Sequence, residues 1–285
     1  MTFIIFTLLI LSLFSSEDRE KMTRLIPLQN ETLLEIEIEF AAGKMVIDKA
    51  DKGVLFEGEF YYSKYTPEIK YYVQNKRGAL FLDMNSNQDK ESEELNVSLN
   101  SLDEIGDTEW YLGFGDQIPL DFSIQMGAAE ANLQFGGLRI KSLDLESGAS
   151  DTQLNFREVN PIQMRTLDIE TGFSEFEASN LLNARFKDMR FDGGVGEYEL
   201  HFGGTLSENV SVTIDVSVGS LFLSVPQDVP FRLECDCSLF SSLDVESAIE
   251  NEDEIWYSRN FQRDKPYINF EIDAGLGSVS LRRID

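Results

Sequence analysis

Paired carboxylates on strand-like segments are the residues of this sequence that are best spaced for acid–base or nucleophilic catalysis. Asp144 and Glu146 lie in SLDLES, and Asp168 and Glu170 lie in the similar segment TLDIET. Residues two apart on a strand share one face, and stacked strands at ~4.8 Å could give the ~5 Å carboxyl separation of a retaining glycosidase. A polysaccharide-degrading enzyme is therefore one hypothesis. Because acidic residues recur throughout and no basic residue accompanies these pairs, solvation of one strand face is the simpler interpretation.

Other catalytic chemistries have few residues to draw on. His201 is the only histidine, so it would have to be the base of any Ser-His-Asp or Cys-His hydrolase. Cys235 and Cys237 are the only cysteines. Two apart on a strand, they have poor geometry for a mutual disulfide and lack further metal ligands nearby, so we expect them to pack. We therefore predict no enzyme activity, no catalytic or metal-binding residue and no cofactor.

Two glycine-rich segments only partly match a phosphate-binding loop. GGVGEYE (193–199) and AGLGSVS (274–280) carry Glu199 and Ser280 where G-x-G-x-x-G needs its third glycine. Neither opens an amphipathic helix, so a nucleotide site is not expected. The carboxylate run Glu250–Glu254 likewise lacks the ligand spacing and turn glycine of an EF-hand loop.

These glycines belong instead to an internal repeat. A strand-like segment is followed by glycine, any residue, a small residue, a polar residue and then alternating residues that end apolar. Successive copies begin 21, 24, 22, 23 and 58 residues apart. They are GAAEANL (127–133), GASDTQL (148–154), GFSEFEA (172–178), GVGEYEL (194–200), SVGSLFL (217–223) and GLGSVSL (275–281), with a related FAAGKMVI at 40–47.

The repeat predicts the fold class. A strand that turns sharply and continues as another strand needs a residue with little or no side chain at the corner. Coils of about 22 residues bury their inward side chains only by stacking on one another. We therefore predict an all-β, single-stranded β-solenoid, a β-helix-like stack with an N-terminal β module. The predicted structural corner residues are Gly43, Gly127, Gly148, Gly172, Gly194, Gly196, Gly219, Gly275 and Gly277.

Composition predicts how the chain is divided. Residues 1–16 hold an apolar run from Phe3 to Phe14, too short to span ~30 Å of bilayer and suited to a signal peptide or short anchor, although no Lys or Arg precedes it. We expect an N-terminal β module at 31–84, an acidic linker or loop at 85–108, and the solenoid domain at 109–285. An acidic excursion at 241–266 interrupts that domain.

Net charge limits the partners. The chain has 51 acidic and 24 basic residues, a formal net charge of −27. Nucleic acid is therefore not an expected partner, because a duplex would be repelled. Its 42% hydrophobic and 11% aromatic content indicates a folded chain instead of a disordered acidic one. With the N-terminal run, these properties predict an exported protein, periplasmic or associated with the cell envelope.

The C-terminal segment resembles the toast-rack domains of bacterial envelope proteins, including the C-terminal domain of Lia-type cell-wall antibiotic response regulators. The resemblance rests on a strand ending in Val225 and Pro226, then Val229 and Pro230, and a last strand with Gly275, Gly277 and Ser278. Segment 34–84 looks like the N-terminal module that accompanies such domains. The resemblance implies a β-solenoid-like stack, an envelope location and no known enzyme activity. Lia-type regulators also carry several transmembrane helices before this domain, whereas this sequence shows none beyond residues 3–14, so we expect an exported or weakly anchored relative.

We therefore expect a non-enzymatic bacterial envelope protein whose repetitive β-solenoid is a protein-interaction or structural scaffold. Its partner would be an envelope protein or a second copy, with peripheral membrane contact through the N-terminus as a further option. A regulator of a cell-envelope stress response is the alternative, and a polysaccharide-binding or polysaccharide-degrading β-helix protein is the second alternative. Candidate contact residues are Trp110, Tyr111, Phe114 and Trp256, each of which would more simply belong to the core.

Overall fold

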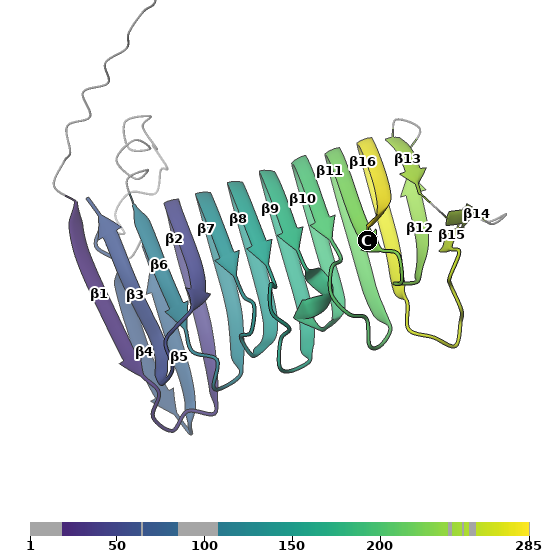
Figure 1. Cartoon of the computed structure of the whole chain (residues 1–285). Helices are drawn as coiled ribbons and strands as arrows, with labels where there is room; N and C mark the ends of the chain where they lie inside the picture. Colours follow the sequence, from purple (N-terminus) through teal and green to yellow (C-terminus); the bar gives the residue numbers. More distant parts are fainter. Residues whose placement is uncertain are drawn as a thin grey trace, which may run out of the picture.

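The computed structural model describes residues 19–63, 65–84, 108–238, 241–246, 248–250 and 255–284. Within these ranges the chain is almost entirely β-strand, and η1 (Leu181–Ala184) is the only helical element. The strands form one open sheet, which confirms the predicted all-β class (Figure 1). The proposed signal peptide or anchor at 1–16, all of the linker except Thr108, and residues 251–254 of the carboxylate run lie outside the described residues.

Long strands make up the middle of the stack and shorter ones make up its ends. The long strands are β2 (Leu33–Lys49), β7 (Leu120–Gln134), β8 (Ile140–Asn155), β9 (Met164–Ser179), β10 (Phe186–His201), β11 (Val210–Pro226) and β16 (Ile268–Ile284). At the N-terminal end lie β1 (Glu20–Pro27), β3 (Val54–Tyr62), β4 (Glu68–Gln74), β5 (Arg77–Asp83) and β6 (Glu109–Phe114). At the C-terminal end lie β12 (Phe231–Cys237), β13 (Ser241–Val245), β14 (Ala248–Glu250) and β15 (Ile255–Ser258).

Each long strand bends at its middle, and the bend brings its two halves face to face. In β10, Phe191 and Tyr198 are seven residues apart, which would separate them by ~23 Å on a straight strand. Their ring centroids are nevertheless 5.2 Å apart. The strand therefore folds over, and both side chains enter one core. We call the halves before the bend the first wall and the halves after it the second wall.

The burial pattern shows where the bend lies. In β7, Met126 is buried, Gly127 and Ala128 are both exposed, and burial resumes at Ala129. Because two consecutive residues are exposed, the alternation of buried and exposed side chains is offset by one residue after the bend. Alternate side chains therefore point into the core on both sides of the bend. Figure 1 shows these bent strands following one another in the order β2-β7-β8-β9-β10-β11-β16. This arrangement is the predicted single-stranded β-solenoid.

The last strand of the chain does not lie at the end of the stack. β16 inserts between β11 and the pair β12 and β13, and it runs parallel to all three. β12 and β13 thus form the two halves of a further coil, which precedes β16 in sequence and lies outside it in space. This coil accounts for the 58-residue offset of the repeat. The predicted excursion at 241–266 accordingly begins with β13 and also contains β15, which pairs antiparallel with β12.

The N-terminal strands continue the same sheet. β2 pairs with β7 along both of its halves. Its first half also pairs with β5, and its second half pairs with β6. β5 and β4 therefore extend the first wall, while β6, β3 and β1 extend the second. Strand pairing thus joins the segment 31–84 directly to the coils that follow residue 108.

The core between the walls is aromatic. Trp110 and Phe114, two of the aromatics proposed for contact, are fully buried. Trp110 packs edge-on against Phe40 and Phe60, with centroid distances of 5.0 and 5.3 Å, so residues from both walls enclose it. Trp256 packs half-buried against the core, and only Tyr111 of the four is exposed. Three of these four aromatics are therefore core residues.

Candidate interaction surface

The structure places the predicted corner residues in two register rows at the bend of the stack. Residues of the first row lie at the bend itself, where the ladder between neighbouring strands skips one residue pair. Residues of the second row lie two positions later and pair across the strands. The first row contains Gly127, Gly148, Gly172, Gly194 and Gly275, and the second contains Gly43, Gly196, Gly219 and Gly277. Ala41 and Ser217 complete the first row in β2 and β11.

An exposed apolar row runs along the outside of this bend, and we call it the ridge. It is formed by the residue that follows each bend, and strand pairing aligns these residues across six neighbouring strands. Phe173 is 68% exposed and Leu276 is 52% exposed. Four of the eleven exposed large hydrophobic side chains of the described residues lie in this single row. The ridge consists of Ala128, Ala149, Phe173, Val195, Val218 and Leu276.

Rows of carboxylates flank the ridge on both walls. On the first wall, the row three residues before the ridge contains Glu146, Glu170, Asp192, Asp215 and Asp273, which are aligned by register. On the second wall, the row two residues after the ridge contains Glu130, Asp151, Glu175 and Glu197. Among the described residues, only Asp192 and Glu130 of these two rows have ion pairs, with Arg190 and Lys44. We call them the first and second acidic rows.

Asp215 shows the electrostatic cost of this arrangement. It lies between Asp192 and Asp273 in the register. Burial raises the pKa of Asp215, and the negative charges of Asp273 and Asp192 raise it further. Since the pKa in the folded state exceeds that in the unfolded state, the ionised side chain destabilises the fold at neutral pH. That penalty disappears as the pH falls through the raised pKa.

We therefore expect Asp215→Asn to stabilise the protein at pH 7 by roughly a few tenths of a kcal/mol, since the site is largely exposed to solvent. The gain should shrink on acidification and in high salt, as followed by urea unfolding. Asp188→Asn is the matched control, because Asp188 pairs with the neutral residues Thr166 and Ser211. An equal gain from both substitutions would contradict the repulsion argument.

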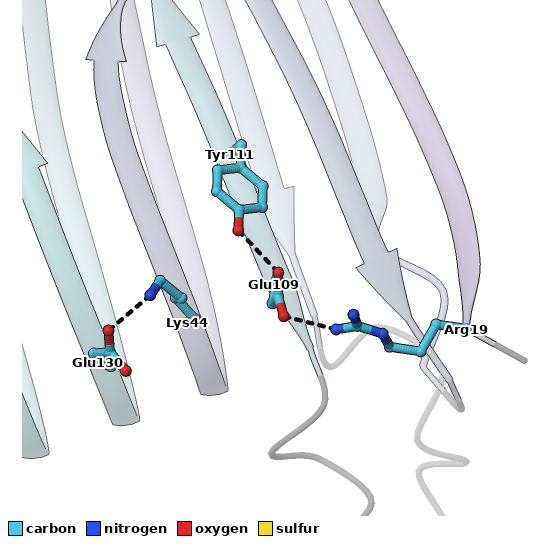
Figure 2. A network of polar contacts seen from close by, with 5 residues as sticks. All are labelled: Arg19, Lys44, Glu109, Tyr111 and Glu130. Atoms are coloured by element: carbon cyan, nitrogen blue, oxygen red, sulfur yellow. Dashed lines mark hydrogen bonds and ion pairs between the residues drawn. The ribbon is translucent and has the colours of Figure 1, made fainter. Parts of the chain in front are cut away.

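The second acidic row is neutralised only at its N-terminal end. Figure 2 shows Lys44 on β2 contacting Glu130 on β7, and Arg19 contacting Glu109 on β6. Glu109 is not one of the four row residues, but it pairs with Lys44 and so lies in line with them. The N···O distances are 2.8 Å for Lys44–Glu130 and 2.7 Å for Arg19–Glu109. Tyr111 donates a hydrogen bond of 2.9 Å to the other carboxylate oxygen of Glu109. The Arg19 hydrogen bond, followed by that from Tyr111, lowers the pKa of Glu109 against the effect of burial. From Asp151 onward no cation neutralises this row among the described residues.

The carboxylates proposed for glycoside chemistry lie on the outer face of the first wall. Asp144 pairs with Asp168, and Glu146 pairs with Glu170. Asp144 and Asp168 line an open groove of about 470 Å³ that also includes Arg165. Burial raises the pKa of Asp144, with smaller contributions from Asp168 and Glu170. The structure thus brings these acids together and adds a basic residue nearby that sequence reasoning did not associate with them.

His201 has a serine partner, although the geometry favours a structural contact. Its Nδ1 lies 2.7 Å from Ser224 Oγ on the neighbouring strand, and its Nε2 lies 3.3 Å from Glu199. A nucleophilic serine must be reachable by substrate, whereas Ser224 is only 1% exposed. We therefore interpret this contact as a polar link between β10 and β11.

The prediction that the two cysteines remain unbonded is wrong. A disulfide joins Cys235 and Cys237, whose Cα atoms are 5.3 Å apart. Residues two apart on a regular strand are separated by ~6.6 Å, so the chain is locally shortened here. β12 ends at Cys237, where the backbone leaves the ladder toward the bend of this coil. The shorter distance is compatible with disulfide geometry.

The ridge is the surface that sequence reasoning did not identify. Its signal was present in the aligned repeats, where the position after the corner residue is Ala, Ala, Phe, Val, Val and Leu in successive copies. In the sequence the residues of the ridge lie beside the predicted corner glycines, and the repeat pattern allows any residue at their position. Their exposure follows from the change of inward side at the bend, which only the structure shows.

Within the ranges that the structure covers, no three or more His, Cys, Asp or Glu side chains are grouped as metal ligands would be. No helix in these ranges is long and apolar enough to cross a membrane.

The fold and this surface define a β-solenoid protein with an exposed, repetitive outer face. The chain belongs to the toast-rack family: the model for the N-terminal domain of toast_rack, DUF2154, matches residues 15–173 of its 285 residues. No curated protein sequence matches the chain.

Comparison with solved structures finds several bacterial proteins of similar extent. A putative cell adhesion protein from Clostridium sporogenes is 19% identical, covers 93% of this chain and 100% of its own, and has a TM-score of 0.49. A putative adhesin from Bacteroides fragilis is 10% identical, with coverages of 92% and 97% and a TM-score of 0.38. A putative lipid binding protein from Parabacteroides distasonis is 10% identical, with coverages of 92% and 96% and a TM-score of 0.30.

Proposed function

We infer that this protein is a non-enzymatic scaffold of the bacterial cell envelope that binds other proteins through the ridge. The observation that carries this proposal is the alignment of Phe173, Val195, Val218 and Leu276 in one exposed row. Burying these side chains against a partner would remove their apolar surface from water and so stabilise the complex. A rigid stack holds the row in one geometry, so that little ordering is needed on binding.

An envelope location is supported by two independent features. The apolar run from Phe3 to Phe14 suits export. The Cys235–Cys237 disulfide suits an oxidising compartment, because thiols are kept reduced in the cytosol. A regulator that binds an envelope-stress sensor would use the same surface, and the identity of the bound protein distinguishes it from a structural scaffold.

Site-specific crosslinking tests the ridge. A photoreactive amino acid at position 173 is expected to give a discrete adduct in the producing cells, whereas the same group at position 159 gives none. Val159 is the matched control, because it is also a large exposed hydrophobic residue, at 53%, and lies in the loop between β8 and β9.

The adduct should also depend on the rest of the row. Val195→Ser combined with Leu276→Ser is expected to reduce its yield about tenfold, which corresponds to ~1.4 kcal/mol of lost binding. Both positions are exposed, so thermal unfolding should change little. Equal adducts from positions 173 and 159, or an adduct that persists in the double variant, would contradict a role for the ridge.

A further inference from the structure

The spacing of the ridge restricts what can lie along it. Neighbouring strands of the stack are ~4.8 Å apart, so the five intervals from Ala128 to Leu276 extend over ~24 Å. A partner strand presents side chains on one face every ~6.7 Å, which does not match this spacing. An amphipathic α-helix places an apolar side chain on the same face about once per turn, which is every ~5.4 Å along its axis. A helix of about 16 residues therefore has the length of the ridge, and its repeat of ~5.4 Å is closer to the ridge spacing of ~4.8 Å than the ~6.7 Å repeat of a strand.

Charge then restricts the composition of that helix. Beside Phe173 lie Glu170 on the first wall and Glu175 on the second, and beside Val195 lie Asp192 and Glu197. Apolar contact along the ridge brings both acidic rows near the partner. Lys or Arg side chains on each side of an apolar stripe could extend to these rows while their stems cover the ridge.

We propose that the ridge binds a basic amphipathic helix of a partner protein, with its apolar stripe on the ridge and its Lys and Arg side chains on the two acidic rows. This inference rests on the proposed function and names the class of partner. A second copy of this chain is disfavoured, because it would bring acidic rows against acidic rows in a protein of net charge −27. An anionic membrane surface is disfavoured for the same reason.

Synthetic helices test the match directly on the folded chain. The probe is a peptide of about 18 residues with leucines along one stripe and lysines on both sides of it, long enough to cover ~24 Å. Its first control carries glutamate in place of lysine, and its second carries a central proline that breaks the helix. Titration calorimetry should show binding of the lysine peptide and at least tenfold weaker binding of each control.

Variants of the chain locate the binding site. Phe173→Ser combined with Leu276→Ser should weaken binding of the lysine peptide at least tenfold, and so should Glu175→Gln combined with Glu197→Gln. Asp188→Asn is the matched control, because it removes one carboxylate of the first wall that lies outside both acidic rows, and binding should be unchanged. Binding should also weaken strongly at ~0.5 M salt, where charges are screened over a few ångström.

Several outcomes would overturn the inference. These are tight binding of the glutamate or proline peptide, lysine-peptide binding that survives both double variants, and failure of the lysine peptide to bind the wild-type chain. Ridge-dependent dimers in sedimentation velocity, or ridge-dependent binding to phosphatidylglycerol vesicles, would assign the ridge to those occupants instead. If the cellular adduct at position 173 is ridge-dependent but its partner lacks a basic helix, the proposed function stands and this inference fails.

Discussion

A chain that ends at Tyr267 is expected to lose its C-terminal coils while β7, β8 and β9 stay folded. β16 pairs along its whole length with β11 on one side, and with β12 and β13 on the other. Its removal therefore leaves two interior strand edges without partners and separates the β12–β13 coil from the stack. Because each coil of a solenoid contacts only its neighbours, the damage should remain local.

Removing β16 also removes buried side chains from the core. Ile268, Phe270, Ile272 and Leu281 of β16 are all almost completely buried. Phe270 contacts Phe202 and Phe231, with ring centroids 5.0 and 6.3 Å away, and so joins the coils on both sides of β16. At roughly 1.5–3 kcal/mol for each large buried side chain, removing the strand costs more than a typical domain can lose.

Amide hydrogen exchange with mass spectrometry measures this outcome by region. In the truncated chain, we expect fast exchange from β11 through β15 and near-native protection in β7, β8 and β9. Phe270→Ala is the graded companion, expected to cost about 3–5 kcal/mol and to raise exchange in the same region without abolishing it. Protection of β12 that persists after truncation would show that its coil is held by something other than β16.

The position of β16 also shows what the sequence could not predict. The repeat correctly indicates coils and a β-solenoid, because corner composition and strand alternation are local properties of the chain. Which strand pairs with which is not local. The β12–β13 coil escaped the alignment because its bend is one residue longer: Cys237 pairs with Ala274 and Ser241 with Gly277, so three residues face two. It also contains no glycine.

The candidate surface was likewise predictable in its local features and unpredictable in the rest. Alternation predicts that Asp192, Asp215 and Asp273 face outward, and the repeat predicts that neighbouring coils align. Neither predicts that the inward side changes at the bend, and this change exposes Phe173 and Leu276. Trp110 is one of the candidate contact residues, with the core as its simpler place, and the structure confirms that simpler interpretation because Trp110 is fully buried against Phe40.

Gly277→Ala is expected to cost about 2–4 kcal/mol and to weaken the C-terminal coils first, from backbone strain together with steric overlap. Gly277 has a φ of +143°, a conformation that residues with a side chain rarely adopt. An added Cβ would also overlap the carbonyl oxygen of Gly219, which lies directly opposite on β11. Relief therefore requires β16 to move away from β11 at the bend.

The two tryptophans of the chain report on opposite ends of the stack. Trp256 lies on β15 beside the coil of β12, and Trp110 lies on β6 near the N-terminal end. In urea, fluorescence from Gly277→Ala in a Trp110→Phe background should show unfolding at lower denaturant than the same background alone. The corresponding shift in a Trp256→Phe background should be smaller, because the defect lies several coils from Trp110.

Gly53→Ala separates the two causes of this loss. Gly53 also has a positive φ, of +89°, but a Cβ built on it meets no atom within 4 Å. It should therefore incur only the backbone strain, about 1 kcal/mol. A clearly larger loss for Gly277→Ala assigns the difference to close backbone packing at the bend. Equal losses would mean that the coils can separate there at little cost, and that Gly277 is required for its backbone conformation alone.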